Sequence, residues 1–436
     1  MARVALHTLG CKLNFAETST LGGQFLDRGY DVVSFSEAAD VYVLNTCSVT
    51  ERADRECRQL IRRALRRSPG AVVVVTGCYA QLAPEEIASI DGVDYVLGTR
   101  EKSSIFAHVH AMEKQAAPQL HVSDVREDND FGAAMSGPAA DRTRAFLKVQ
   151  DGCDYTCSYC TIPLARGASR SQDVDACVTQ ARTLVDQGYK EIVLTGVNVG
   201  DYGRKIGSSL LALLRELVTV EGLHRIRISS IEPNLLTDDI LSFVADHPQV
   251  CRHFHIPLQS GSDTVLRRMR RRYAAEMYAG LVRRVRERFP DAGIGVDVIT
   301  GFPGETDAEF GETHLLLADL PVSYLHVFTY SERPNTPAAE IPDRVAPAVR
   351  AQRNESLRIL GDRKRMLFAE RHVGQTLEVL AESTVHDGVR SGFTGSFLRV
   401  GFPADAVQEN QLVQIRVTGI TGDHCTGIVA GEGRQE

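Results

Sequence analysis

Three cysteines lie within eight residues of this 436-residue chain, in the segment Cys153-Asp-Tyr-Thr-Cys157-Ser-Tyr-Cys160. The segment directly follows an apolar stretch, Phe146–Gln150, that we expect to be a β-strand. Three thiols this close in sequence can converge on one metal centre. Zinc would need a fourth protein ligand, yet neither a cysteine nor a histidine follows in the next dozen residues. A cubane iron–sulfur cluster can leave one iron open, so the spacing favours such a cluster over zinc and over a loop of unliganded cysteines.

The composition is typical of a cytosolic protein with two or three domains, being 43% hydrophobic and 24% charged. The ten cysteines of an intracellular chain are better interpreted as metal ligands or catalytic groups than as disulfides. The longest apolar runs, such as Ala71–Val75, are far shorter than the roughly 18 residues that span a bilayer. The apolar run Val4–Leu6 is too short for a secretory signal. We therefore expect a cytoplasmic protein with no membrane partner.

The hydrophobic pattern predicts an α/β fold class with three domains. Residues 1–110 alternate β-rich runs with helical stretches, which indicates an open parallel α/β domain. Residues 111–142 are polar without a sustained period, and we interpret them as a linker. Residues 143–365 hold about six β/α units, which predicts a full or partial TIM-like barrel. Residues 373–436 show short alternating strands separated by glycines, as in a small β-barrel. The expected barrel strands are Phe146–Gln150, Glu191–Thr195, Arg225–Ser229, His253–Pro257, Gly295–Thr300 and Tyr324–Thr329.

A second set of cysteines is spread through the first domain. Cys11, Cys47 and Cys78 each follow a predicted strand, and the carboxyl ends of parallel strands share one edge of an open sheet. Sequence-distant thiols can meet there. The alternative is that all three are packed as small hydrophobic residues. Placement at a strand end three times out of three favours a second iron–sulfur cluster with an open iron.

The first cysteine set, with Tyr159 directly before its last member, resembles the signature of the radical S-adenosylmethionine (SAM) superfamily. The resemblance implies that Cys153, Cys157 and Cys160 hold a catalytic 4Fe-4S cluster, whose open iron binds SAM and cleaves it to a 5'-deoxyadenosyl radical. Small and polar residues end the later barrel strands, as at the SAM-binding edge of such barrels. The resemblance implies SAM contacts at Tyr159, Gly196, Asn198, Glu232, Gln259 and Ile299.

The order of the two cysteine sets and the C-terminal β-domain is similar to that of the methylthiotransferases, over nearly the whole chain. In that family the N-terminal domain carries an auxiliary 4Fe-4S cluster, and the C-terminal domain is an RNA- or substrate-binding TRAM module. The resemblance implies that Cys11, Cys47 and Cys78 hold the auxiliary cluster. It also implies a tRNA substrate and an electron donor protein such as flavodoxin or ferredoxin.

Three motifs distinguish the branches of this family: Thr8–Asn14, Asn45–Thr50 and Ala165–Arg170. They look most like the branch that adds a methylthio group to N6-threonylcarbamoyladenosine at position 37 of tRNA. The alternatives are methylthiolation of isopentenyladenosine in tRNA or of a ribosomal protein. A non-enzymatic iron–sulfur protein that binds RNA or senses redox state is a further alternative of another class.

Basic residues gather in two stretches although the formal charge of the chain is −7. Residues 52–67 contain seven arginines against two acidic residues, and residues 263–288 contain nine against three. Both stretches are candidates for contact with a phosphate backbone, and solvated helix faces are an equally good interpretation. We expect Arg268 and Arg271 to bind tRNA, because residues 373–436 hold only four arginines against eight acidic residues.

Overall fold

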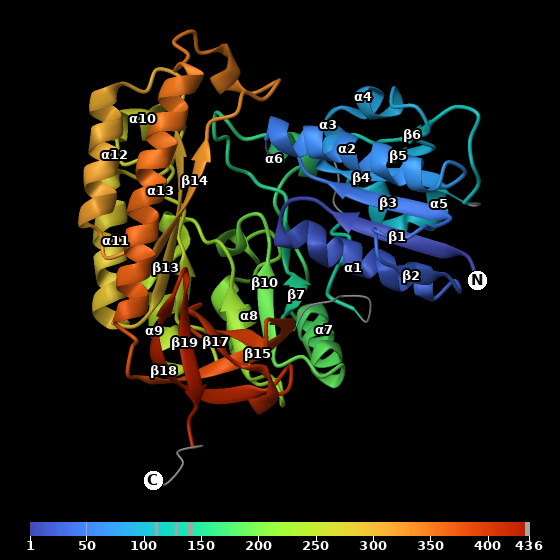
Figure 1. Ribbon diagram of the computed structural model, residues 1–436. Helices are drawn as coiled ribbons and strands as arrows, with labels where there is room; N and C mark the ends of the chain where they lie inside the picture. The colour runs from blue at the N-terminus through green and yellow to red at the C-terminus, as the bar shows by residue number, and fades with distance from the viewer. Residues whose placement is uncertain (49, 110–111, 127–129, 138–142, 432–436) are drawn as a thin grey trace.

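The computed structural model describes residues 1–48, 50–109, 112–126, 130–137 and 143–431. Figure 1 shows an N-terminal lobe beside a larger barrel lobe, with a small β-domain against the foot of the barrel. Within the described residues, no helix is both long enough and apolar enough to cross a membrane.

The N-terminal lobe is built on a six-stranded parallel sheet with the strand order β2-β1-β3-β4-β5-β6. The central strands β3 and β4 are buried along their whole length, because helices cover both faces of the sheet. Helix α2 buries one stripe of small and apolar side chains and leaves the opposite face exposed. The elements are β1 (Arg3–Thr8), α1 (Lys12–Leu26), β2 (Asp31–Val33), β3 (Val41–Thr46), α2 (Glu51–Arg67), β4 (Val72–Gly77), α3 (Cys78–Leu82), α4 (Pro84–Ala88), β5 (Tyr95–Leu97), the 3-10 helix η1 (Glu101–Ser104), α5 (Ile105–His108) and β6 (Gln119–His121).

The barrel lobe contains six parallel strands in two sheets, β7-β10-β11 and β12-β13-β14. A parallel bridge between Ser230 and His255 joins the two sheets into one arc. The strands are β7 (Ala145–Lys148), β10 (Glu191–Thr195), β11 (Arg225–Ile228), β12 (His253–His255), β13 (Gly293–Thr300) and β14 (Tyr324–Thr329), with β8 (Gln150–Asp151) and β9 (Arg170–Ser171) as a short antiparallel pair. The helices are α6 (Ile162–Arg166), α7 (Val174–Asp186), α8 (Leu210–Leu217), α9 (Asp238–Asp246), α10 (Asp263–Arg268), α11 (Ala275–Arg288), α12 (Asp307–Asp319) and α13 (Pro347–Glu370).

The C-terminal domain is a closed five-stranded barrel with the order β15-β16-β17-β19-β18. Its turn after β16 reaches the foot of the large barrel, where a Cβ on Gly293 would lie 2.0 Å from the carbonyl oxygen of Ser396. Arg225 donates to the carbonyl of Phe393, and Arg227 donates to that of Gly395. The strands are β15 (Thr376–His386), β16 (Val389–Thr394), β17 (Arg399–Pro403), β18 (Leu412–Thr421) and β19 (His424–Val429).

The predicted fold class is confirmed: an open parallel sheet, a partial barrel and a closed β-barrel follow one another along the chain. Residues 111–142, which we expected to be a linker, contain one strand of the N-terminal sheet. Strand β6 lies inside residues 111–142 and pairs with β5 through the register Val96 to Leu120. A three-residue strand at a sheet edge is too short for an alternating pattern to reveal it. Residues 111, 127–129 and 138–142 of that linker lie outside the described residues, as do residues 432–436 of the last domain.

Candidate functional site

The loop with the first three cysteines is held in place by backbone contacts from two sides. Gly152 has a φ of +67°, and a Cβ there would lie 2.0 Å from the carbonyl oxygen of Ala168, so only glycine fits. The amide of Cys153 donates to the carbonyl of Gly167 at 3.1 Å. Ser158 donates through its hydroxyl to the carbonyl of Arg268 at 2.7 Å. The loop therefore has a fixed shape between β8 and α6.

Arg271 supports the middle cysteine of this loop. Its guanidinium donates to the Sγ of Cys157 at 3.1 Å and to the hydroxyl of Tyr273 at 3.1 Å, and it forms an ion pair with Glu232. The Arg271 side chain is only 3% exposed. Arg271 is therefore a residue of the site and not a surface contact for tRNA, and the expectation from its position in a basic stretch is wrong.

Two of these sulfur atoms, those of Cys153 and Cys160, lie in surroundings that disfavour a free thiolate. Burial raises the pKa of Cys153 to about 11 and that of Cys160 to about 12. Such sulfurs ionise when a metal centre binds them and displaces their protons. Within the described residues, neither cysteine set has all three sulfur atoms within 4.8 Å of one another. A single tetrahedral zinc ion would bring three sulfur atoms to about 4 Å of one another, closer than either set is placed.

A cavity of about 220 Å³ opens beside Cys160. Three of the predicted SAM contacts, Tyr159, Gln259 and Ile299, line it together. Gln259 has a φ of +67°, and its carbonyl accepts from the amide of Ile299 at 2.9 Å, which brings these two residues to one edge of the cavity. The other residues that line it are Thr50, Thr161, Ile162, Asp297, Phe328, Thr329, Tyr330 and Ser331.

The remaining predicted SAM contacts do not line this cavity. Gly196 and Asn198 lie after β10 and are fixed by Gln150, whose Oε1 accepts from the amide of Asn198 at 2.8 Å. Glu232 lies after β11 and pairs with Arg271, which reaches Cys157.

Two polar side chains near these strand ends lack partners among the described residues. Both side-chain polar atoms of Asn198 and the hydroxyl of Ser229 are buried without a hydrogen-bond partner. Since a buried polar group without a partner costs free energy, these atoms fit a site built to receive a polar ligand such as SAM. Which individual residues contact SAM stays a prediction.

The second cysteine set lies at one edge of the N-terminal sheet, after the neighbouring strands β1, β3 and β4. Gly10 has a φ of +95°, and a Cβ there would lie 2.7 Å from the Sγ of Cys47, so the loops of Cys11 and Cys47 are in direct contact. Gly77, directly before Cys78, would place a Cβ 2.5 Å from the carbonyl oxygen of Thr46. The structure thus brings the three loops together as the sequence predicts, with Cys11 exposed and the other two buried.

Asn14 ties these loops to each other and to the barrel. Its amide donates to the carbonyls of Leu9 at 2.8 Å and Thr46 at 3.0 Å. Its Oδ1 accepts from Arg166 at 2.5 Å. Arg166 is the last residue of α6, the five-residue helix that begins two residues after Cys160. One short helix therefore connects the two cysteine sets.

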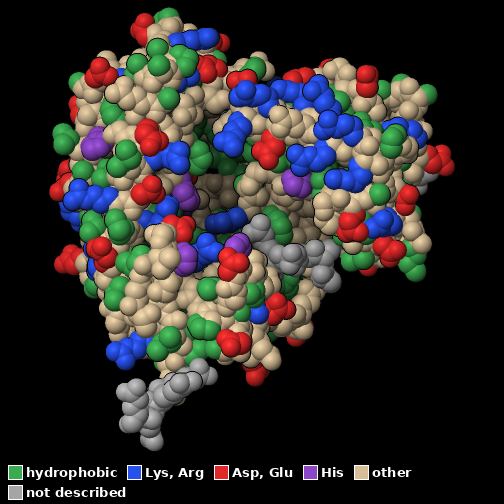
Figure 2. Space-filling model, in the orientation of Figure 1, with side chains coloured by type: hydrophobic (Ala, Val, Ile, Leu, Met, Phe, Trp, Pro, Cys, Tyr) green, Lys and Arg blue, Asp and Glu red, His purple; other side chains and the backbone are tan. Residues whose placement is uncertain are grey.

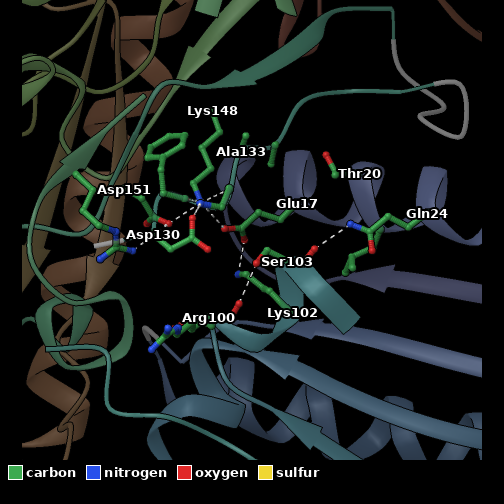
Figure 3. A pocket seen from close by; sticks show the side chains of 16 residues that line it. Glu17, Thr20, Gln24, Arg100, Lys102, Ser103, Asp130, Ala133, Lys148 and Asp151 are labelled. Carbon is green, nitrogen blue, oxygen red and sulfur yellow. Dashed lines mark hydrogen bonds and ion pairs between the residues drawn. The ribbon is translucent and has the colours of Figure 1, made fainter. Parts of the chain in front are cut away.

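A buried charge network lies at the contact between the lobes, and Figure 3 shows its members Glu17, Lys102, Lys148 and Asp151. Glu17 of α1 accepts from Arg166 at 3.0 Å and from Lys148 at 3.2 Å, and it also pairs with Lys102. Asp151 accepts from Arg166 at 2.9 Å and from Lys148 at 2.6 Å. The network lines a small cavity of about 30 Å³, and it holds the N-terminal lobe against β7 and α6.

A second contact joins the two lobes beside the 220 Å³ cavity that lies next to Cys160. Arg333 donates to Ser48 at 2.6 Å and to the carboxylate of Asp54 at 2.7 Å. The amide of Glu51 donates to the hydroxyl of Ser331 at 3.2 Å. The N-terminal end of α2 therefore sits at the rim of the cavity, which both Thr50 and Ser331 line.

The two basic stretches differ in how far they remain open to solvent. In residues 263–288, Arg268 bonds the carbonyl of Gly304 and pairs with Glu309, and Arg286 donates to three backbone carbonyls. On α2, by contrast, six arginines are exposed, and Figure 2 shows basic side chains gathered over this part of the N-terminal lobe. They are Arg52, Arg55, Arg62, Arg63, Arg66 and Arg67.

Sequence reasoning missed the charged residues inside the barrel. His255 donates through Nε2 to the carboxylate of Asp297 at 2.9 Å, and its Nδ1 lies 2.6 Å from the hydroxyl of Ser230. His326 lies 3.2 Å from the same carboxylate. The usable signal was the strand register, which pairs Asp297 with His326 on β13 and β14. The polarity of His326 fits the position of β14 at the edge of its sheet, where only Leu325 of the strand is buried.

Two family models match the chain, "Uncharacterized protein family UPF0004" over residues 3–98 and "Radical SAM superfamily" over residues 147–317. The threonylcarbamoyladenosine tRNA methylthiotransferase MtaB of Bacillus subtilis is 41% identical over 423 residues, covering 96% of this chain and 94% of that protein. The protein of the same name from Aquifex aeolicus is 39% identical and covers 87% of this chain and 92% of its own. A tRNA-2-methylthio-N(6)-dimethylallyladenosine synthase from Parafrankia is 34% identical, over 95% of this chain and 83% of that protein.

Among solved structures, the radical SAM methyltransferase TsrM from Kitasatospora setae, with cobalamin and a [4Fe-4S] cluster bound, has a TM-score of 0.53 at 16% identity. The match covers 90% of this chain and 81% of that one, and at this identity it shows the fold alone. The first two relatives match 96% and 87% of this chain, so each match extends over both lobes. The chain therefore belongs to the radical SAM methylthiotransferase family.

Proposed function

We propose that this protein adds a methylthio group to C2 of N6-threonylcarbamoyladenosine at position 37 of tRNA. The observation that carries the proposal is the pair of cysteine sets in adjoining lobes, connected through α6 and Arg166. A radical generator and a sulfur source must both reach one base, and this arrangement supports that requirement. We infer the substrate from the relatives named for threonylcarbamoyladenosine, which are 41% and 39% identical to this chain. The relative named for dimethylallyladenosine is 34% identical.

Cys153, Cys157 and Cys160 would hold the SAM-cleaving cluster, and Cys11, Cys47 and Cys78 the auxiliary cluster. When bound, the clusters and SAM supply radical chemistry at an inert aromatic C–H bond, a methyl group and a sulfur atom. The protein's own task is to position the reactants and to exclude water. The cavity beside Cys160 would seat SAM against Gln259 and Ile299, with Tyr159 as its aromatic wall.

Arg271 would act as a positioning residue for this site. It joins the Cys157 loop to Glu232, a predicted SAM contact on the next part of the barrel edge. A bound amino acid group beside this ion pair would meet one fixed carboxylate and one fixed guanidinium. Asn198 and Ser229, with buried polar atoms that lack partners among the described residues, would complete its polar contacts.

The exposed arginines of α2 would bind the phosphate backbone of tRNA. The helix starts at the rim of the cavity and leads away from it across the N-terminal lobe (Figure 1). An anticodon loop that places its base in the cavity would therefore lay its stem along these arginines. The C-terminal domain is acidic overall and is poorly suited to non-specific RNA binding.

An electron donor protein such as flavodoxin or ferredoxin would reduce the SAM-cleaving cluster. The exposed basic face of α2 would attract a donor with an acidic surface, because complementary charges steer association. Competition between tRNA and the donor for this face can be tested by adding the donor to the complex with tRNA, or tRNA to the complex with the donor.

Mass spectrometry of tRNA nucleosides tests the function. A strain lacking this gene should lose the 2-methylthio derivative of threonylcarbamoyladenosine, and the wild-type gene should restore it. Loss of the dimethylallyl derivative instead would assign the protein to the other tRNA branch. Loss of a ribosomal protein modification alone, or binding of tRNA without any 5'-deoxyadenosine formation, would contradict the proposal.

A further inference from the structure

Helix α1 of the N-terminal lobe covers part of the inner face of the barrel. Phe15 and Ala16 pack in one cluster with Phe146 of β7 and Val193 of β10. The rings of Phe15 and Phe146 meet edge to face at 5.4 Å between centroids. Figure 1 shows the start of α1 directed toward the barrel, and Figure 2 shows a hollow between the two lobes.

Lys12 is the first residue of α1 and lies on this same helix face. Residues three and four apart share a face, so Lys12 stands one turn before Phe15 and Ala16 and faces the interior of the barrel. It lies within electrostatic range of Arg144, Arg227 and Asp297, which belong to the barrel lobe. Lys12 is exposed as a whole residue, although partial burial of its ammonium lowers the pKa of that group to about 8.

The other charges near Lys12 already have partners. Arg227 donates to Glu191 at 2.6 Å, and Arg144 donates to Glu382 at 3.0 Å. Asp297 lies between two histidines, at 2.9 and 3.2 Å. Among the described residues, the side chain of Lys12 makes no hydrogen bond or ion pair. One cation of the barrel interior is therefore free to bind an anion.

The surroundings of Lys12 are electropositive. Burial lowers the pKa of His253 well below its usual range, and the charges of Arg227 and Lys12 lower it further. A ligand with a negative group is favoured in such a place. Asp297, which lies within electrostatic range of Lys12, also lines the cavity beside Cys160, so Lys12 lies on the side of the barrel that holds the candidate SAM site.

We propose that Lys12 binds the carboxylate of the threonyl group on the substrate adenosine, an inference that rests on the proposed function. The threonylcarbamoyl group ends in a free carboxylate, whereas a dimethylallyl group is a hydrocarbon. An ammonium and a carboxylate form a charge-assisted hydrogen bond, which a hydrocarbon cannot make. Lys12 thereby selects the carboxylate-bearing adenosine, and the barrel places C2 of that base toward the SAM site.

The test compares two anticodon stem-loops, one with the free threonyl carboxylate and one with its methyl ester. The wild-type protein should bind the acid about 10-fold more tightly than the ester, as expected for one charge-assisted bond. Lys12→Met should bind both equally, and Lys12→Arg should keep the preference. Because the readout is a ratio of two affinities in the same protein preparation, a partial loss of folding or of iron does not change it.

Two outcomes would overturn the inference. A wild-type protein without a preference for the acid contradicts it, as does a Lys12→Met variant that keeps the wild-type ratio. Failure of the proposed function looks different, since the wild-type protein would then leave threonylcarbamoyladenosine tRNA without a methylthio group. If the wild-type enzyme methylthiolates this tRNA but Lys12→Met keeps the wild-type affinity ratio, the proposed function stands and the proposed role of Lys12 is wrong.

Discussion

Arg271 is the side chain on which the geometry of the candidate SAM site depends most directly. Its guanidinium contacts the sulfur of Cys157, the carboxylate of Glu232 and the hydroxyl of Tyr273. Its neighbour Arg272 lies instead over the ring of Tyr155, with its Cζ 3.9 Å from the ring centroid, and is exposed. Two adjacent arginines thus have different roles, which no count of basic residues distinguishes.

Replacing Arg271 should therefore damage the site while replacing Arg272 should not. Arg271→Met leaves the Glu232 carboxylate buried without its cation, which costs about 3 kcal/mol of unfolding free energy. We expect a clear drop of the melting temperature and a loss of 5'-deoxyadenosine formation. Arg272→Met is the matched control and should cost less than about 1 kcal/mol. Thermal unfolding and chromatography of the nucleoside product measure both, and equal effects of the two variants would contradict the assignment.

The two cysteine sets should separate by iron content. Cys157→Ala should remove the SAM-cleaving cluster and abolish both 5'-deoxyadenosine and methylthio product. Cys47→Ala should remove about half of the iron and stop the methylthio product while leaving some SAM cleavage, because its loop lies in the other lobe. Cys57→Ala is the control, since Cys57 is buried in α2 and should keep full iron. Full iron and full product in Cys47→Ala would mean that the N-terminal cysteines are only packed thiols.

Helices α1 and α6 show how elements far apart in sequence join the lobes. Glu17 of α1 accepts from Arg166 of α6, and Lys102 and Lys148 add two further cations. Burial alone would raise the pKa of Glu17, but these three cations outweigh burial and lower it. The same balance lowers the pKa of Asp151. Both carboxylates therefore stay ionised at neutral pH and bind the lobes together.

This network gives stability a defined pH dependence. A carboxyl group whose pKa is lowered in the folded state stabilises the fold above its ordinary pKa, and the contribution is lost as the pH falls. The melting temperature should therefore decrease as the pH is lowered below about 4.5, the ordinary pKa of a glutamate. Glu17→Gln should lower the melting temperature at pH 7 and flatten this acid limb. Glu37→Gln, which removes a half-exposed pair with Arg3, is the control and should leave the curve unchanged.

The face of α2 provides a prediction about tRNA. Arg62 and Arg66 are exposed and lie one turn apart on this helix. Exchanging both for glutamine should weaken binding to all tRNA sequences alike and reduce the slope of log K against log salt by about 1 to 2. Arg358→Gln with Arg363→Gln, on the exposed face of α13, is the matched control. An equal loss from the α13 pair would mean that α2 carries no specific share of the RNA contact.

At the scale of elements, the sequence predicts the longer strands of the barrel well. Glu191–Thr195 and Tyr324–Thr329 match β10 and β14 residue for residue. The hydrophobic pattern does not reveal β5 and β6, because three residues give no measurable period. It also fails for the partners of charged residues. Lys148 and Glu17 are separated by 131 residues, and nothing in the sequence pairs them before the lobes come together.

The whole molecule differs from a chain of independent domains, because each domain closes part of the barrel. Helix α1 covers the inner face beside β7, and the turn after β16 fills the foot. Arg227 is 1% exposed and joins Glu191 of the barrel to the carbonyls of Thr394 and Gly395. Sequence motifs locate the cysteines, but only these contacts between domains define the space in which the base must lie.

The fit of the C-terminal domain into the foot of the barrel is testable at Gly293. A Cβ there would lie 2.0 Å from the carbonyl oxygen of Ser396, and that atom belongs to a backbone turn that cannot yield easily. Gly293→Ala should therefore push the C-terminal domain away and turn a single calorimetric transition into two. Gly280→Ala is the matched control, because a Cβ at that position of α11 meets only the end of the Arg284 side chain, at 3.6 Å. The control should raise stability by up to about 1 kcal/mol, as alanine favours a helix over glycine. A single unchanged transition in Gly293→Ala would show that the turn does not hold the two domains together.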